Sequence, residues 1–156
     1  MKILVISDTH GYIGNAVSLI EEMNPDYIVH LGDIASDCGE LVSIYPMKRI
    51  ICVLGNNDFF CKNYPIDRVA QIGDKIIYMC HGHKCNVKAG LELLKRTARE
   101  KNADIVLFGH THTAYVEQTD DMLIMNPGST RTYGVITIEN GKVTGEVFDI
   151  WRRVYV

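Results

Sequence analysis

The chain has few of the features typical of proteins that bind nucleic acids or membranes. The chain has 16 lysines and arginines and 19 acidic residues, which gives a net charge of −3. The basic residues form no stripe along the sequence. Proteins that bind nucleic acid by releasing counterions usually carry such a stripe, so we expect no stable nucleic-acid complex. No apolar run approaches the ~20 residues that span a bilayer, so we expect no membrane association.

The sequence also lacks the marks of a secreted, disulfide-rich protein. It opens on the strand-like segment KILVIS, with no basic n-region and no cleavage site. Its five cysteines are an odd number, and none shows CxxC spacing. We therefore expect a cytoplasmic protein with reduced thiols, some of them packed as small apolar residues. Cys85 follows His81 by four residues and is a weak candidate for a metal ligand.

Length and apolar content indicate one globular domain. The chain has 156 residues, 47% of them hydrophobic, with no linker, repeat or low-complexity tract. Domains commonly run from about 100 to 200 residues. We therefore expect a single domain over residues 1–156 with a substantial core.

The first third of the chain alternates strand and helix patterns. Short apolar runs predict strands at Lys2–Ser7, Tyr27–Leu31 and Arg49–Leu54. Apolar residues at helical spacing predict helices at Gly14–Met23 and Cys38–Ile44. This alternation favours parallel strands joined by right-handed crossovers.

The rest of the chain predicts more strands than one small parallel sheet can hold. Turn pairs at Gly73-Asp74 and Asn140-Gly141 predict two hairpins. The further predicted elements are a helix at Lys88–Lys101, a buried strand at Asp104–Phe108, the first hairpin's strands Arg68–Ile72 and Lys75–Cys80, and antiparallel strands at Tyr115–Gln118, Met122–Met125, Val135–Glu139 and Val143–Phe148. Two sheets packed face to face, with helices outside, accommodate these elements best. We therefore predict a layered α/β sandwich.

Five predicted strands end, on their C-terminal side, in glycine together with a potential metal ligand. The segments at these ends are SDTHG (7–11), GD (32–33), GNND (55–58), HGH (81–83) and GHTH (109–112). The carboxyl ends of parallel strands share one edge of a sheet, where ligands bind. We therefore expect the five segments to converge on one site.

Each of these residues alone has an ordinary structural explanation. A histidine after a strand is more often a hydrogen-bonded loop residue, and Asp8 could cap the helix that follows it. The coincidence of four of the six histidines with two aspartates at strand ends favours a site instead. His30 lies inside a predicted strand and is expected to be structural. His83 could be a ligand, a substrate contact or a hydrogen-bond donor to a ligand.

The residue types favour two metal ions over one. Imidazole together with carboxylate suits manganese, iron, nickel or zinc. A single zinc hydrolase site needs about three protein ligands, and this set offers roughly twice as many. Two ions about 3.5–4 Å apart that share a carboxylate are typical of phosphoryl chemistry. We therefore expect two divalent cations, each of them manganese, iron, nickel or zinc.

The five segments, followed in order by NPGS at Asn126–Ser129, resemble the calcineurin-like metallophosphoesterase superfamily. Within it, the chain looks like the small bacterial and archaeal phosphodiesterases over nearly its whole length. The resemblance implies a four-layer αββα sandwich, with two mixed β-sheets flanked by helices and a metal site at the strand C-terminal ends. It also implies a metal-dependent enzyme that hydrolyses small phosphodiesters by a metal-bridging hydroxide.

The resemblance implies a role for each candidate ligand. One ion would be held by Asp8, His10, Asp33 and His112, and the other by Asp33, Asn56, His81 and His110, with Asp33 bridging. The four positive charges of two divalent ions exceed the three negative charges of two aspartates and a hydroxide by about one. That surplus would attract an anionic phosphoester.

Asn57 departs from the pattern of many relatives, which have a histidine at its position that protonates the leaving group or binds phosphate. An amide cannot deliver a proton at neutral pH, although it can donate a hydrogen bond to phosphate. We therefore expect Asn57 to bind substrate and phosphomonoesterase activity to be weak. His83 is the nearby candidate for a substitute donor, so Asn57 and His83 are the candidate catalytic residues.

Three questions stay open from the sequence. A eukaryotic retromer scaffold subunit resembles the same fold, so a non-catalytic metal-binding scaffold is the alternative function. A purely structural metal protein is disfavoured because a surplus positive charge suits hydrolysis better than a closed site does. The C-terminal strands and the segment Trp151–Val156 suggest a homo-oligomer, unless Trp151 and Tyr155 pack on their own core.

Overall fold

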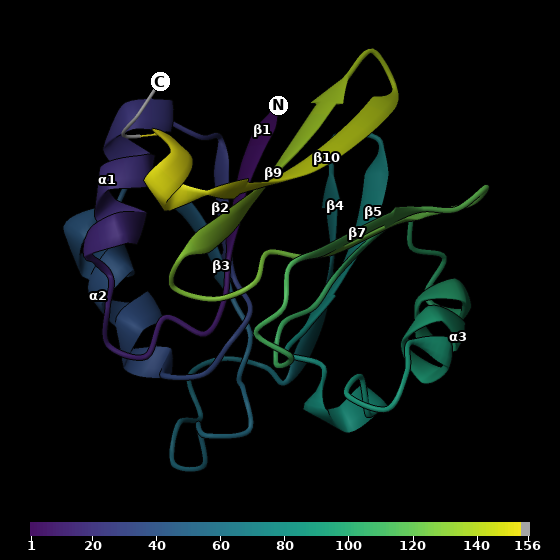
Figure 1. Cartoon of the computed structure of the whole chain (residues 1–156), viewed down its shortest axis with the longest axis horizontal. Helices are drawn as coiled ribbons and strands as arrows, with labels where there is room; N and C mark the ends of the chain where they lie inside the picture. The colour runs from purple at the N-terminus through teal and green to yellow at the C-terminus, as the bar shows by residue number, and fades with distance from the viewer. Residues whose placement is uncertain (154–156) are drawn as a thin grey trace.

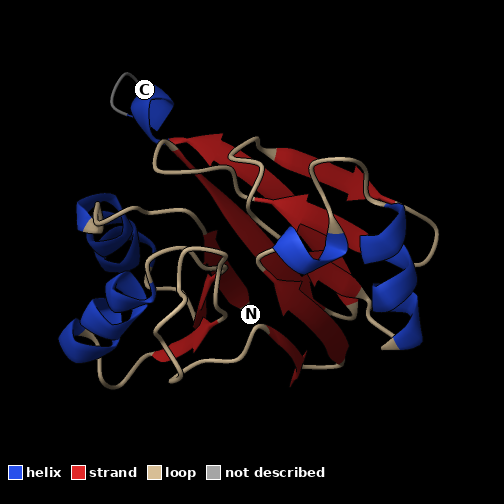
Figure 2. Cartoon of the chain, turned by 90° about the horizontal axis from the view of Figure 1, so that it is seen from below, coloured by secondary structure: helices blue, strands red, loops and turns tan. Residues whose placement is uncertain are grey.

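The computed structural model describes residues 1–153 and forms four layers in the order helix, sheet, sheet, helix. Two mixed five-stranded sheets lie between helices on the two outer sides, as Figures 1 and 2 show in perpendicular views. The predicted αββα sandwich is confirmed.

The first sheet carries the parallel strands predicted from the first third of the chain. Its order is β10-β9-β1-β2-β3, and β1, β2 and β3 run parallel. The strands are β1 (Lys2–Ile6), β2 (Tyr27–His30), β3 (Arg49–Cys52), β9 (Thr132–Glu139) and β10 (Lys142–Asp149). Helices α1 (Gly14–Met23) and α2 (Ala35–Ile44) connect the three parallel strands.

The second sheet has the order β4-β5-β6-β8-β7. Its strands are β4 (Asp67–Ile72), β5 (Lys75–Cys80), β6 (Ile105–Leu107), β7 (Tyr115–Gln118) and β8 (Leu123–Asn126). The prediction that β8 is only antiparallel was wrong, because β8 pairs antiparallel with β7 but parallel with β6. After β6 the chain passes to the sheet edge to form β7, and β8 then returns to fill the place between them.

Both predicted hairpins are present, β4–β5 and β9–β10. The second turn contains Asn140 with φ 51° and Gly141 with φ 75°. Two successive left-handed residues give a turn whose twist matches the twist of the flanking strands. The local turn chemistry therefore determined these pairings.

Two helices begin elsewhere than the sequence predicts. α2 begins at Ala35 instead of Cys38, because the Asp58 carboxylate accepts the Ala35 N–H at 2.7 Å. α3 covers Glu92–Glu100 instead of beginning at Lys88. A 3-10 helix, η1 (His83–Cys85), and Gly90 with φ 157° precede α3, so the chain is not α-helical there. A second 3-10 helix, η2 (Ile150–Arg153), follows β10.

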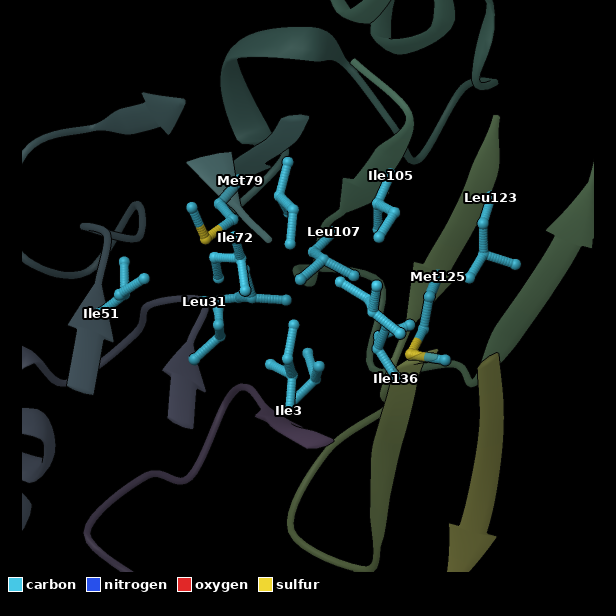
Figure 3. Packing of buried hydrophobic residues seen from close by; sticks show 14 of the residues in the cluster. Ile3, Leu31, Ile51, Ile72, Met79, Ile105, Leu107, Leu123, Met125 and Ile136 are labelled. Carbon is cyan, nitrogen blue, oxygen red and sulfur yellow. The ribbon is translucent and has the colours of Figure 1, made fainter. Parts of the chain in front are cut away.

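The core consists of one apolar cluster between the sheets and one under each helical layer. β1 is buried on both faces: Ile3 and Val5 join the central cluster of Figure 3, and Leu4 and Ile6 face α1 and α2. Successive side chains of a strand point to opposite faces, so a strand between two layers is apolar throughout. The central cluster fixes how the two sheets, and hence their loops, lie relative to each other.

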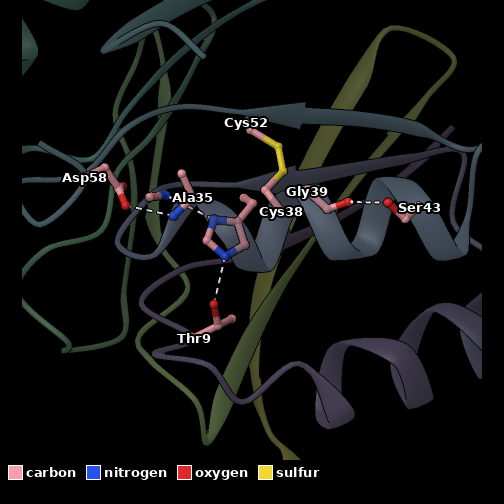
Figure 4. The surroundings of a disulfide bond; sticks show 9 residues. Thr9, Ala35, Cys38, Gly39, Ser43, Cys52 and Asp58 are labelled. Atoms are coloured by element: carbon pink, nitrogen blue, oxygen red, sulfur yellow. Dashed lines mark hydrogen bonds between the residues drawn. A yellow bond between two sulfur atoms is a disulfide. The ribbon is translucent and has the colours of Figure 1, made fainter. Parts of the chain in front are cut away.

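The expectation that the cysteines are reduced thiols was wrong for two of them. Cys38 of α2 and Cys52 of β3 form a disulfide, shown in Figure 4. α2 packs against β3, which places the two Cα atoms 6.5 Å apart, within disulfide range. Cys61, Cys80 and Cys85 are free.

The C-terminal part of the described chain leaves apolar surface exposed. Trp151 is 58% exposed and does not pack into the core, whereas Phe148 stacks on Tyr133 with ring centroids 5.5 Å apart. Tyr155 lies outside the described residues. Oligomerisation through this end stays a prediction. Within residues 1–153, no helix is both long and apolar enough to cross a membrane.

Candidate metal centre

The five segments at the predicted strand ends meet at the lower edge of the two sheets in Figure 1, which Figure 2 views from below. Backbone hydrogen bonds join the segments in pairs. The Asp8 N–H donates to the Gly32 carbonyl at 3.1 Å, and the Gly109 N–H donates to the His81 carbonyl at 2.8 Å. Loops far apart in sequence are therefore held side by side.

One group of four side chains is close enough to share a cation. Asp8, His10, Asp33 and His112 each offer a ligand atom, and these atoms all lie within 4.8 Å of one another. The Nε2 atom of His112 is 3.0 Å from Oδ1 of Asp8. Both carboxylates are buried and both imidazoles lie at the surface, so the group is open to solvent on one side.

A second set of side chains lies close to Asp33. The Nε2 atom of His81 is 3.5 Å from Oδ1 of Asp33 and 3.2 Å from Nδ1 of His110. The opposite ring nitrogen of His81, Nδ1, lies 2.7 Å from the Leu31 carbonyl and must donate to it. Donation from Nδ1 leaves Nε2 with a lone pair, the arrangement typical of a metal-ligating histidine.

Two buried oxygens at this site have no hydrogen-bond partner among residues 1–153: Oδ1 of Asp8 and Oδ1 of Asn56. Nearly all buried polar atoms in folded proteins are paired, and each exception needs an explanation. A cation beside each of these oxygens would satisfy it. The residues therefore fit divalent ions of the kind that bind mixed oxygen and nitrogen ligands.

The backbone at the ligands is unusual. Five of the seven candidate ligands have positive φ: Asp8 (55°), His10 (48°), Asp33 (59°), His110 (70°) and His112 (59°). A left-handed conformation costs a residue other than glycine about 1 kcal/mol or more, and it persists only where the surroundings enforce it. Such residues cluster at functional sites, and no sequence motif reveals them.

The glycines of the motifs allow close approach of the loops. A Cβ atom on Gly55 would lie 2.1 Å from Oδ1 of Asp33, and one on Gly109 would lie 2.1 Å from Oγ of Ser7. Neither space can hold a methyl group. The glycines in GNND and GHTH are therefore required by packing against the first two loops.

Asp58 supports the site and was not singled out from the sequence. It is 9% exposed, and its two carboxylate oxygens accept the N–H groups of Ala35 and Gly55, both at 2.7 Å. Figure 4 shows the bond to Ala35. Asp58 thus ties the loop of Asn56 to the start of α2, next to Asp33. Its only sequence signal is its position in GNND.

A buried chain of hydrogen bonds joins the first two loops. The Gly32 N–H donates to Nδ1 of His30 at 3.2 Å, and Nε2 of His30 lies 2.8 Å from Oγ1 of Thr9. The Thr9 hydroxyl donates to Asp37, which also accepts the Gly11 N–H at 2.8 Å. Because Nδ1 accepts, the neutral His30 ring donates from Nε2, and burial lowers its pKa to about 4. His30 is therefore structural, as expected.

The two candidate catalytic residues, Asn57 and His83, differ in their hydrogen bonding. The amide group of Asn57 donates to Oδ2 of Asp33 at 2.8 Å, and its backbone N–H donates to Oδ1 at 3.1 Å. His83 has a buried Nδ1 with no hydrogen-bond partner among residues 1–153, and its ring centroid is 5.6 Å from that of His81. Burial, and then the neighbouring His81, lower the pKa of His83. Cys85, the weak candidate, packs into the core under α3 and is absent from the cation group.

Two curated relatives cover most of this chain. The probable metallophosphoesterase YsnB of Bacillus subtilis is 30% identical over an alignment of 159 positions, which covers 96% of this chain and 91% of that protein. The phosphodiesterase MJ0936 of Methanocaldococcus jannaschii is 31% identical over 163 residues, covering 88% and 90% of the two chains.

Solved structures share the fold. A conserved protein of Streptococcus pneumoniae, described as a predicted phosphoesterase, superposes with a TM-score of 0.80 at 26% identity and covers 95% of this chain and 88% of its own. Vps29 of Entamoeba histolytica in complex with zinc has a TM-score of 0.76 at 22% identity, covering 96% and 99%. The likeness to Vps29 concerns the fold alone.

The family itself is given by a match over most of the chain. Residues 1–141 match the model of the calcineurin-like phosphoesterase superfamily domain. This range contains all five strand-end segments and the NPGS segment. The chain therefore belongs to the calcineurin-like phosphoesterase superfamily.

Proposed function

We propose that this protein is a phosphodiesterase that hydrolyses small phosphodiesters with two divalent metal ions. The observation that carries the proposal is that two buried oxygens of candidate ligands, Oδ1 of Asp8 and Oδ1 of Asn56, have no hydrogen-bond partner among residues 1–153. One ion is assigned to Asp8, His10, Asp33 and His112, and the other to Asp33, Asn56, His81 and His110. Mn²⁺ or Ni²⁺ is favoured, with iron or zinc as alternatives.

Asp33 is assigned as the bridging ligand because it lies between both groups. It belongs to the four-residue cluster, and its Oδ1 is also 3.5 Å from Nε2 of His81. The two hydrogen bonds from Asn57 hold its carboxylate in place, and His81 is held by the Leu31 carbonyl. When bound, two divalent ions supply positive charge to a phosphate and acidify water.

The preference for diesters is supported by a relative and by a residue. MJ0936 carries the name phosphodiesterase, and this chain has an amide, Asn57, where a proton donor would help a poor leaving group depart. Burial, and then the neighbouring His81, lower the pKa of His83, which disfavours its protonated form. Substrates with good leaving groups should therefore react best.

The proposed function is tested by metal stoichiometry together with hydrolysis. The metal-free protein should bind two Mn²⁺ ions per chain in a calorimetric titration, and it should hydrolyse bis(4-nitrophenyl) phosphate only when both are bound. Binding of a single ion would contradict the two-metal site. Two bound ions without hydrolysis of any aryl diester would favour the non-catalytic scaffold instead.

Replacing Asn57 by histidine should raise the phosphomonoesterase rate relative to the phosphodiesterase rate by about 10-fold. Positioned acids contribute roughly 10²–10⁴-fold to such steps, and we expect part of that gain because the new imidazole is not otherwise positioned. The ratio of kcat/KM for an alkyl monoester to that for an aryl diester is measured at matched metal loading. His83→Gln serves as the control for the other donor. An unchanged or lower ratio in Asn57→His would show that Asn57 does not determine the preference.

A further inference from the structure

A cavity of about 340 Å³ lies beside the metal centre. It is lined by residues of the loop between β3 and β4 and of η1. Both segments lie at the lower edge of Figure 1. Its walls include Leu54, Asn56, Phe59, Ile66, His83 and Lys84. Ligand pockets in proteins commonly enclose about 300–1,000 Å³, so the cavity can hold one ring system.

The cavity shares one residue with the proposed metal site. Asn56 lines it and is also an assigned ligand whose Oδ1 is buried without a partner. His83 lines the opposite wall, and its Nδ1 is also buried without a partner. Because Asn56 belongs both to the proposed metal site and to the cavity wall, the cavity is the place for one ester group of a phosphate held by the ions, with Nδ1 of His83 beside that group.

The walls are suited to a flat apolar group. Leu54 is 9% exposed and Ile66 is 48% exposed, while Phe59 presents 79% of its surface. An aromatic side chain beside an open site offers a face on which a planar ring can stack. Asp58 also lines the cavity, but its two oxygens already accept backbone N–H groups. Lys84 adds one positive charge, so a cationic ester group is disfavoured.

We propose that this cavity binds one ester group of the substrate, that this group is a planar aromatic ring, and that Phe59 determines the preference for it. The proposal rests on the proposed phosphodiesterase function and names the substrate class of the same site. Phe60 provides the matched control, because it is 98% exposed in the same loop and does not line the cavity.

The test uses two phosphonates, which the protein cannot hydrolyse at the carbon–phosphorus bond. Binding of phenylphosphonate and methylphosphonate to the Mn²⁺-loaded protein is measured by calorimetry. The wild-type protein should bind phenylphosphonate about 10-fold more tightly, since stacking on one aromatic side chain contributes on this order. Phe59→Ala should remove most of that difference and leave the affinity for methylphosphonate unchanged, and Phe60→Ala should change neither.

Equal affinity of the wild-type protein for the two phosphonates would overturn the proposal, and so would the same loss in Phe60→Ala as in Phe59→Ala. Either outcome leaves the proposed function intact if the protein still hydrolyses bis(4-nitrophenyl) phosphate. If neither phosphonate binds and no diester is hydrolysed, the proposed function fails and the substrate preference fails with it.

Discussion

Asp33→Asn should lower phosphodiesterase activity by about 10³-fold or more. Asp33 is 2% exposed, belongs to the four-residue cluster, and has its Oδ1 3.5 Å from Nε2 of His81, so it is assigned to both proposed ions. An amide removes a negative charge at the point where two dications would approach each other, and it leaves one oxygen in place of two. The bridge between the ions is therefore lost even though the side-chain volume is kept.

The Asp33→Asn experiment compares kcat/KM for bis(4-nitrophenyl) phosphate and the number of Mn²⁺ ions bound per chain. Asp74→Asn is the control, because its carboxylate lies at the exposed β4–β5 turn. We expect Asp33→Asn to bind fewer than two ions and the control to behave as wild type. Wild-type rates in Asp33→Asn at equal metal loading would exclude a bridging role for this carboxylate.

Gly55→Ala should lower activity by about 100-fold or more and reduce the free energy of unfolding by about 1–3 kcal/mol. The added Cβ would lie 2.1 Å from Oδ1 and 2.4 Å from the backbone nitrogen of Asp33. The nitrogen belongs to the backbone and cannot rotate away, so the loop of Asn56 must move from the loop of Asp33. Two ligands assigned to the same ion would then be displaced relative to each other.

Gly39→Ala is the matched control for Gly55→Ala. Gly39 lies inside α2, where a Cβ would meet only the Tyr64 hydroxyl at 3.9 Å. Alanine favours a helix interior over glycine by up to about 1 kcal/mol, so this variant should be slightly more stable and fully active. Urea unfolding of the metal-free proteins separates stability from metal binding. Full activity in Gly55→Ala would show that the loops tolerate the separation.

Local patterns were sufficient for most of the architecture. Short apolar runs that alternate with segments of helical periodicity predicted the parallel strands β1, β2 and β3. The turn pairs predicted both hairpins. The residues that terminate five strands gave the candidate ligands, because the direction of a parallel strand determines the edge at which it ends. The prediction was poorest where a segment's neighbours decide its state, as at the start of α2 and in the pairing of β8.

The contacts that hold the candidate ligands in place could not be predicted from local sequence patterns. The hydrogen bond from the His110 N–H to Asp8 joins residues 102 positions apart, and the Cys38–Cys52 disulfide joins α2 to β3, a contact that depends on how the helix packs on the sheet. Neither Asp58 nor His30 stands out in the sequence. Their structural roles are evident only from their hydrogen-bond partners in the folded chain.

The sequence by itself determined the fold class, the family and the chemistry of the metal ligands, because these depend on periodicity, on turn residues and on which side chains end each strand. Only the tertiary structure decided the left-handed backbone of five ligands, the contact of Asn57 with Asp33 and the cavity beneath Phe59. Each of these depends on how loops from the two sheets pack together at one edge. That packing is fixed by the apolar cluster between the sheets, whose residues come from strands of both sheets that are distant from one another along the chain.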